Sequence, residues 1–210
     1  LKNIKEIYWQ TPFSNGHYLK SDENIQKISD LIIKRVVLVS SDITEEYLVI
    51  RKPIVMETEI IPKKELYVEV AYKISKDKSE KEIIIKEPNS KLFVYFPTEK
   101  ETYLNFLIQG PFKTTPNREN IPLNDEQNQI ILDEISNLIA ESLPIVRDLG
   151  YLDVNFLNIL PINSELVDSE QIYSIIYKKI KEKFLSEELL PTSDSKYSKA
   201  EDALLARGKE

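Results

Sequence analysis

The residues best suited to chemistry lie in one proline-rich loop, GPFKTTPNRENIP, at residues 110–122. Lys113 and Arg118 supply positive charge there, and Thr115 and Asn117 supply polar side chains. Arginine is scarce in this chain, with five copies against 23 lysines. A guanidinium offers a planar set of donors to phosphate, and hydroxyls, loop amides and a nearby helix start add further donors. The loop therefore predicts an anion-binding site in which Arg118 is the main residue.

Three prolines make this loop stiff. Proline fixes its own φ and biases the preceding residue toward extended geometry. We therefore expect Gly110, Thr115 and Ile121 to be extended rather than helical. A stiff loop can hold one side chain in a constant direction, as an anion site requires.

Other interpretations of the charged residues remain open. Arg118 alone also fits a surface ion pair with Glu119 or Asp125, which would contribute about 0–1 kcal/mol. The acids within 42–46 and 99–103 are candidates for a paired general acid and base, as in a free-standing hydrolase. Acidic residues in turns are more often solvated, and no histidine or ligand cluster accompanies them in the sequence.

The elements that must position the loop change character near residue 123. Before it, short runs rich in β-branched and aromatic residues alternate with turn signals, which predicts a sheet of about five or six strands. The predicted strands are residues 31–40, 45–55, 65–74, 81–86, 91–97 and 102–109. In the third run, Leu66, Val68, Val70 and Tyr72 alternate, which predicts one buried face.

After residue 123 the apolar period becomes helical. Asn124 is a suitable N-cap for a first helix, with Gln127 at the capping-box position, and Gly150 is placed to end it. Pro144 should kink this helix. Its apolar stripe consists of Ile131, Ile135, Leu138, Ser142, Ile145 and Leu149.

A second helix is expected at residues 169–184, with a stripe of Ile172, Ile175 or Ile176, and Ile180. Residues 186–198 have the composition of a linker. A short last helix follows, with Ser198 and Glu201 in capping-box spacing.

The predicted fold class is therefore α+β, a mixed sheet in the N-terminal part that packs with helices from the C-terminal part. The predicted organisation is a β-rich portion at 1–123, a helical portion at 124–185, and a linker with a short helix at 186–210. Whether the first two portions form one domain or two is left open.

Composition excludes several function classes. The net charge of −7 and pI near 5.1 argue against general nucleic-acid binding, which depends on clustered lysine and arginine. The chain has no cysteine and one histidine, His17 beside an Asn-Gly turn signal, so it lacks a thiolate or histidine metal site. No glycine-rich phosphate loop and no membrane-length apolar run is present, and we expect a cytoplasmic chain that binds no ATP alone. A first residue of leucine suggests a segment of something longer.

Several elements together resemble one family. The runs FPTE and IQGPF-TTP-R-N-IP lie in this order within residues 91–152, FLNILPI follows at 156–162, and LLPT lies within 189–208, with EEYLVIRKP upstream. This arrangement resembles the segment that follows the ATP-binding domain in sacsin-like proteins of the GHKL ATPase superfamily. Tyr103 stands where that pattern has a glycine, so the turn before the last strand is expected to differ.

The resemblance implies a transducer-like, ribosomal-S5-domain-like segment without the Bergerat-type ATP pocket, whose boxes are absent here. A looser likeness to the middle domain of the ninety-kilodalton heat-shock chaperones places Arg118 where an arginine reaches the γ-phosphate of ATP. Lys113, Thr115 and Asn117 would assist it. ATP and Mg would be held mainly by an upstream domain of the same polypeptide, and a protein client is a further expected partner of this chaperone-like protein. The alternative is a non-catalytic protein-binding or scaffold module.

Overall fold

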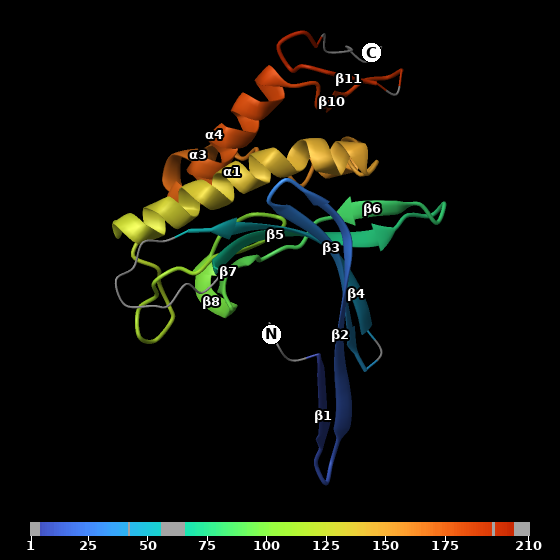
Figure 1. The fold of residues 1–210 in the computed structure, drawn as a ribbon, viewed down its shortest axis with the longest axis vertical. Helices are drawn as coiled ribbons and strands as arrows, with labels where there is room; N and C mark the ends of the chain where they lie inside the picture. Colours follow the sequence, from blue (N-terminus) through green and yellow to red (C-terminus); the bar gives the residue numbers. More distant parts are fainter. Residues whose placement is uncertain (1–4, 42, 56–65, 195, 204–210) are drawn as a thin grey trace.

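The protein is a large β-sheet with helices on one face, seen in a computed structural model that describes residues 5–41, 43–55, 66–194 and 196–203 (Figure 1). Nine strands form the main sheet. They are β1 Glu6–Gln10, β2 Asn15–Ile28, β3 Leu31–Ser40, β4 Ile43–Ile54, β5 Leu66–Lys76, β6 Glu82–Ile85, β7 Lys91–Val94, β8 Phe96–Glu101 and β9 Leu107–Gln109. The α+β class with a mixed sheet and C-terminal helices is confirmed, but the sheet is larger than the five or six strands predicted.

The strand order is β1-β2-β3-β4-β5-β9-β7-β8, with β6 paired to β5 beside β9. Every pair is antiparallel except β7 and β9, which are parallel. The predicted strand at 91–97 is divided at Tyr95, whose φ of 61° turns the chain from β7 into β8. The predicted strand at 102–109 is reduced to β9. Two strands at the N-terminus, β1 and β2, were not predicted at all.

The missed strands have little apolar alternation because they are largely solvent-exposed. The Asn-Gly pair read as a turn lies inside β2, where Asn15 faces Gln10 and Gly16 faces Trp9. The turn itself is residues 11–14, closed by a 2.7 Å hydrogen bond from Thr11 N–H to the Ser14 carbonyl. His17 is consequently a strand residue, and its Nε2 lies 2.9 Å from Glu6 Oε1.

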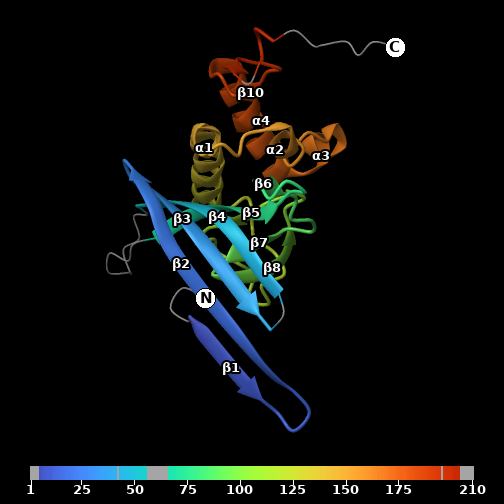
Figure 2. The ribbon, with the colours of Figure 1, turned by 90° about the vertical axis from the view of Figure 1, so that its right-hand side faces the viewer.

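Figures 1 and 2 show that β1 and the adjoining part of β2 extend away from the helices as a projecting hairpin. We call residues 5–20, which comprise β1, the turn and the start of β2, the arm. All five residues of β1 are exposed. The rest of the sheet carries the core.

The long helix α1, Glu126–Asp148, lies across the sheet and packs its buried side chains into that core. Its N-cap is Asp125 rather than the predicted Asn124, because the Asp125 carboxylate accepts from the N–H groups of Gln127 and Asn128. The helix continues through Pro144 and is followed by Gly150 at φ 81°, as the sequence predicts for a left-handed terminus.

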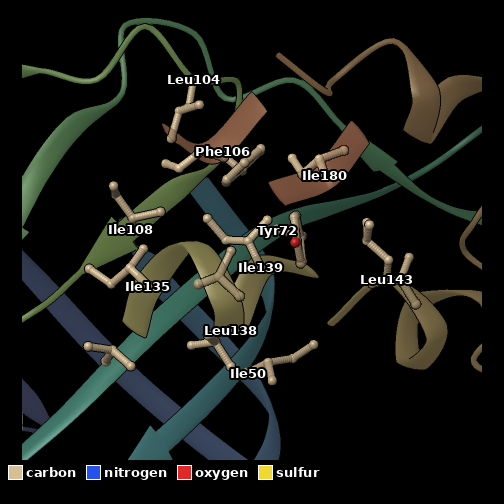
Figure 3. Close-up of a cluster of buried hydrophobic side chains, with 14 of the residues drawn as sticks. Ile50, Tyr72, Leu104, Phe106, Ile108, Ile135, Leu138, Ile139, Leu143 and Ile180 are labelled. Carbon is tan, nitrogen blue, oxygen red and sulfur yellow. The ribbon is translucent and has the colours of Figure 1, made fainter. Parts of the chain in front are cut away.

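The core joins the buried faces of β4, β5 and β9 to α1 (Figure 3). The predicted alternation in β5 is confirmed at Val68, Val70 and Tyr72, which are fully buried. Tyr72 packs against Phe106 and Phe156 at ring-centroid distances of 5.3 and 5.5 Å, and its hydroxyl lies 2.8 Å from Ser142 Oγ. This bond explains why a serine occupies the apolar stripe of α1.

The remaining helices are α2 Val154–Leu157, α3 Ser164–Ser169 and α4 Gln171–Ser186. The second predicted helix corresponds to α4, although Ser169 ends α3 rather than starting α4. The predicted stripe is confirmed, with Ile176 rather than Ile175 in the buried position between Ile172 and Ile180.

The predicted linker at 186–198 is instead a small hairpin of β10 Leu190–Pro191 and β11 Tyr197–Ser198. It is ordered by buried Leu189 and by a 2.9 Å bond from Ala200 N–H to the Phe184 carbonyl. Ser198 therefore belongs to a strand and does not cap a helix. Residues 199–203 form a turn rather than the predicted last helix, with a 3.2 Å bond from Asp202 N–H to the Lys199 carbonyl, and the rest of that helix lies outside the described residues.

Candidate functional site

The loop between β9 and α1 is held at both ends by one buried side chain of α1. Asn128 Oδ1 accepts from Lys113 N–H at 2.8 Å, and its Nδ2 donates to the carbonyls of Lys113 at 3.0 Å and Pro122 at 2.9 Å. The Asn128 side chain is completely buried. Because these three bonds fix both ends of the loop to the first turn of a long helix, the loop is ordered by hydrogen bonds as well as by its prolines.

The middle of the loop is a tight turn between Thr115 and Asn120. Thr115 N–H donates to the Asn120 carbonyl at 3.0 Å, and Asn120 N–H donates to Thr115 Oγ1 at 3.1 Å. Arg118 N–H closes the turn on the Thr115 carbonyl at 2.8 Å. Arg118 has φ 59°, the left-handed conformation that side-chain-bearing residues rarely adopt.

The Arg118 guanidinium reaches back over the corner between β7 and β8. Its Nη2 donates to the carbonyls of Val94 at 2.9 Å and Phe96 at 3.3 Å. The guanidinium carbon also lies 6.0 Å from the centre of the Phe96 ring. Arg118 is partly buried, and Tyr95 and Phe96 beside it are 45% and 53% exposed.

No carboxylate pairs with Arg118 among the residues that the structure describes. The alternative ion pairs with Glu119 and Asp125 are therefore wrong. Glu119 instead accepts from Asn117 Nδ2 at 2.6 Å, and Asp125 accepts from Lys113 Nζ at 2.9 Å. The carbonyls orient the guanidinium without neutralising it, so its positive charge remains available to an anion.

The three predicted helper residues do not converge on this guanidinium. Lys113 is tied to Asp125 at the base of the loop, and its bond is the main reason why the pKa of the Asp125 carboxyl is lowered. Thr115 and Asn117 are bonded to each other, at 2.7 Å from Thr115 Oγ1 to Asn117 Oδ1. These contacts stabilise the turn that presents Arg118.

The loop also covers the outer edge of β8. Glu99 N–H donates to the Arg118 carbonyl at 3.3 Å. Arg118 therefore bonds to the edge of β8 through its backbone and to the β7–β8 corner through its side chain. Neither this double contact nor the clamp, the three bonds by which Asn128 holds both ends of the loop, was predicted from the sequence. A signal for the clamp was available, because Asn128 lies at the helical spacing that continues the apolar stripe upstream of Ile131 and Ile135.

The acidic candidates for a hydrolase do not form a site. Glu45 and Glu46 point to opposite faces of the sheet, where they pair with Lys73 and Arg35 respectively. Glu99 pairs with Lys91. Each of these three carboxylates therefore has a lysine or arginine partner, and no contact in the described part of the chain brings two of them together to act as acid and base. Glu101 bonds to Tyr103, and Asp42 lies outside the described residues.

One charged network lies around Arg35, which bonds to both Glu46 and Glu82. Tyr151 donates to Glu82 at 2.6 Å, and the Arg35 and Tyr151 bonds lower the pKa of the Glu82 carboxyl. Burial, followed by the bond to Glu82, raises the pKa of Tyr151 to about 12. Because every member is paired, this network ties β3, β4 and β6 to the end of α1.

A shallow hollow of about 300 Å³ lies where the end of β4 meets α1. Its charged residues are Lys52 and Glu134, and Lys52 Nζ also lies 3.2 Å from both oxygens of Glu141. Because of these mutual contacts, the described residues of the hollow offer no converging set of unpaired polar groups.

The described residues contain no group of three or more His, Cys, Asp or Glu side chains placed to hold a metal ion. None of their helices combines the length and the apolar character that crossing a bilayer requires.

Comparison with known proteins gives no match to any family model, to any curated protein or to any solved structure.

Proposed function

We propose that this chain is the transducer-like middle segment of a GHKL-type, sacsin-like ATPase. In this proposal Arg118 binds the γ-phosphate of ATP, and ATP and Mg are held by a Bergerat-type domain upstream in the same polypeptide. The observation that supports the proposal is the guanidinium of Arg118, which is oriented by the Val94 and Phe96 carbonyls and meets no carboxylate in the described part of the chain.

The arrangement suits a terminal phosphate for an electrostatic reason. Both carbonyl bonds come from Nη2, which leaves Nη1 and Nε with their own N–H donors. A phosphate oxygen would be met by Nη1, while the carbonyl bonds keep the guanidinium plane fixed. Positive charge that is already in position when charge develops on a transferring phosphoryl group lowers the barrier without reorganisation.

The rigidity of the loop supports the same proposal. The Asn128 clamp and the Thr115–Asn120 turn hold Arg118 relative to α1 and the sheet. A rearrangement of the phosphate would therefore act on the whole sheet and helix layer rather than on a loose loop. Phosphate that binds Arg118 in only one interdomain arrangement would favour that arrangement by its differential affinity.

The exposed aromatic surface beside the guanidinium fits a neighbouring domain. Tyr95 and Phe96 lie at the β7–β8 corner, next to Arg118. Burial of such rings at a domain contact is favourable, and it would exclude water from around the phosphate and Arg118. Lys113, Thr115 and Asn117 act in this proposal as supports of the loop, with Lys113 the one exposed cation among them.

The left-handed backbone of Arg118 allows a sharp test. Glycine adopts φ 59° without strain, so Arg118→Gly removes the guanidinium and keeps the turn. In a polypeptide that contains both this chain and the proposed ATP-binding domain, we expect ATP turnover to fall by about 10³-fold or more. ATP affinity should change only a few-fold, and the isolated 210-residue chain should hydrolyse no ATP.

Arg147→Ala is the matched control for this test. Arg147 is also partly buried, but it binds Asp148 and the Glu188 carbonyl at the far end of α1. We expect turnover to be unchanged in this variant. Turnover in Arg118→Gly within two-fold of the parent, with ATP binding intact, would overturn the proposal.

The second candidate function is a protein-binding or scaffold module in which the loop is purely structural. The exposed apolar residues of the arm favour it. Hydrogen exchange of residues 110–122 in the same two-domain polypeptide separates the candidates. Protection that appears on addition of ATP supports the phosphate-binding function, whereas identical exchange with and without ATP supports the binding module.

A further inference from the structure

The arm exposes more apolar surface than its packing explains. Tyr8 and Trp9 are 65% and 41% exposed, and Phe13 at the turn is 98% exposed. Among the described strands β1 pairs only with β2, and both views show its outer side facing no other described element (Figures 1 and 2). An uncovered edge strand of this kind is a template for pairing with another strand.

The hydrogen-bond pattern shows which backbone groups of β1 are free. Lys20 N–H donates to the Lys5 carbonyl and Thr11 N–H donates to the Ser14 carbonyl, both at 2.7 Å, so bonded pairs stand at both ends of the β1–β2 ladder. Bonded and non-bonded pairs alternate in antiparallel strands. Ile7 and Trp9 therefore bond to β2, and the N–H and C=O groups of Glu6, Tyr8 and Gln10 point outward.

We propose that β1 pairs antiparallel with β1 of a second copy of this chain, about a two-fold axis that passes between the two Tyr8 residues. In this register Tyr8 faces its own copy, Glu6 faces Gln10, and Ile7 faces Trp9. All three outward residues then become bonded pairs, because alternate residues of each strand already point toward the partner. The proposal is independent of the ATP-dependent function, since β1 and the Arg118 loop lie at opposite ends of the strand order.

The side chains are self-complementary in this register. Ile7 and Trp9 lie on one face of β1, and the two-fold axis brings both copies of each into one apolar cluster across closely spaced non-bonded pairs. The single charge of β1, Glu6, faces the amide of Gln10. A parallel pairing in register would instead place Glu6 beside Glu6, which is destabilising.

The first test removes one outward N–H. Tyr8→Pro deletes a donor that the β1–β2 ladder does not use, and proline is tolerated at such a position on an edge strand. Sedimentation equilibrium of the 210-residue chain should show a dimer for the parent and for Tyr8→Thr, which keeps the N–H. Tyr8→Pro should be monomeric over the same concentrations, with a circular dichroism spectrum that matches the parent.

The second test reads the register directly. The chain has no cysteine, so a single introduced thiol reports one pair. Tyr8→Cys places the two Cα atoms about 5.5 Å apart, within disulfide range. Gln10→Cys places them about 14 Å apart, four residues along the strand. Under mild oxidation we expect linked dimer from Tyr8→Cys and monomer from Gln10→Cys.

A parent chain that is monomeric throughout would overturn the proposal and leave the edge to a different partner. A dimer that survives Tyr8→Pro, or that links equally well through Gln10→Cys, would overturn it as well. Neither result would affect the Arg118 test, which measures turnover at the other end of the sheet.

Discussion

At one end of the sheet the edge strand β8 is covered, and at the other end the edge strand β1 is open. The Arg118 loop bonds to the outer N–H of Glu99, and Pro97 has no N–H to leave free. The outer part of β8 also carries Lys100 and Glu101, charges that oppose strand addition. β1, with the sequence EIYWQ, has no proline, no lysine and no covering loop among the described residues.

This difference indicates separate uses for the two edges. The β8 edge is closed within the chain, by a loop that is itself fixed to α1 through Asn128. The β1 edge is available for contact between chains. The Arg118 loop consequently has a structural role in addition to the proposed phosphate contact, and a test of function must leave the edge covered, as Arg118→Gly does.

Among variants at the two edges, Asn128→Ala is expected to cause the largest loss of stability. The substitution leaves the Lys113 and Pro122 backbone groups without partners in a fully buried place, which should lower the free energy of unfolding by about 3 kcal/mol. Urea unfolding followed by circular dichroism measures the loss. Hydrogen exchange should show that the Glu99 amide at the β8 edge loses protection.

The matched change in the arm is Trp9→Ala, read at a protein concentration below the proposed dimerisation. Trp9 is partly exposed and belongs to no core cluster, so a loss of about 0.5 kcal/mol or less is expected. Equal losses in the two variants would show that the two edges do not differ in the proposed way.

The next largest loss of stability is expected from alanine substitution of a glycine, and Gly110 and Gly16 allow the two regions to be compared. A Cβ on Gly110 would lie 2.7 Å from Ile131 and about 3 Å from Ile135, both packed in the core, so Gly110→Ala should cost about 2 kcal/mol. A Cβ on Gly16 would overlap the Trp9 ring at 1.9 Å, but that ring is partly exposed and can move outward. Gly16→Ala should therefore cost less, and thermal unfolding of both variants tests the order. A larger loss for Gly16→Ala would mean that the arm is as tightly packed as the core.

How well the sequence predicted each region follows from how that region is stabilised. The core strands β3, β4 and β5 were predicted closely because one buried face imposes alternation, as in Val68, Val70 and Tyr72. The arm was missed because its residues are held by ladder hydrogen bonds that any sequence can form. Its one turn signal, Asn15-Gly16, serves the approach of Trp9 instead of a turn.

The loop was recognised, but its contacts were not. Prolines and a rare arginine mark it in the sequence, whereas the partners of Arg118 are backbone carbonyls 24 and 22 residues upstream. Carbonyls exist at every residue, so no side-chain pattern identifies them. The buried Asn128 was the recognisable exception, because a polar residue in an apolar stripe needs a polar partner.

A smaller effect, of opposite sign, is expected at Tyr103, close to the end of β8. Tyr103 has φ 58°, the left-handed conformation that glycine favours. Tyr103→Gly relieves left-handed strain but increases the freedom of the unfolded chain, for a net gain of about 0.5 kcal/mol. Tyr103→Ala keeps the strain and should show no gain in urea unfolding. A gain of equal size in both variants would point to the ring rather than the backbone.

The smallest effect is the change of stability with pH at Asp125, where the Arg118 loop meets α1. The bond from Lys113, together with the N–H groups of Asn128 and Gln127, lowers the pKa of Asp125 below its ordinary value near 4. A lowered carboxyl pKa contributes stability above the unfolded value, and this contribution is lost as the pH falls through the folded value. Asp125→Asn keeps an oxygen for the helix N-cap but cannot titrate. We expect it to be slightly less stable than the parent at pH 7 in urea unfolding, and to match the parent near pH 2.

The same substitution in a Lys113→Ala background should show a smaller difference at pH 7, because the principal cause of the shift has been removed. A difference that is constant between pH 7 and pH 2 would mean that the carboxylate charge does not stabilise the covered edge.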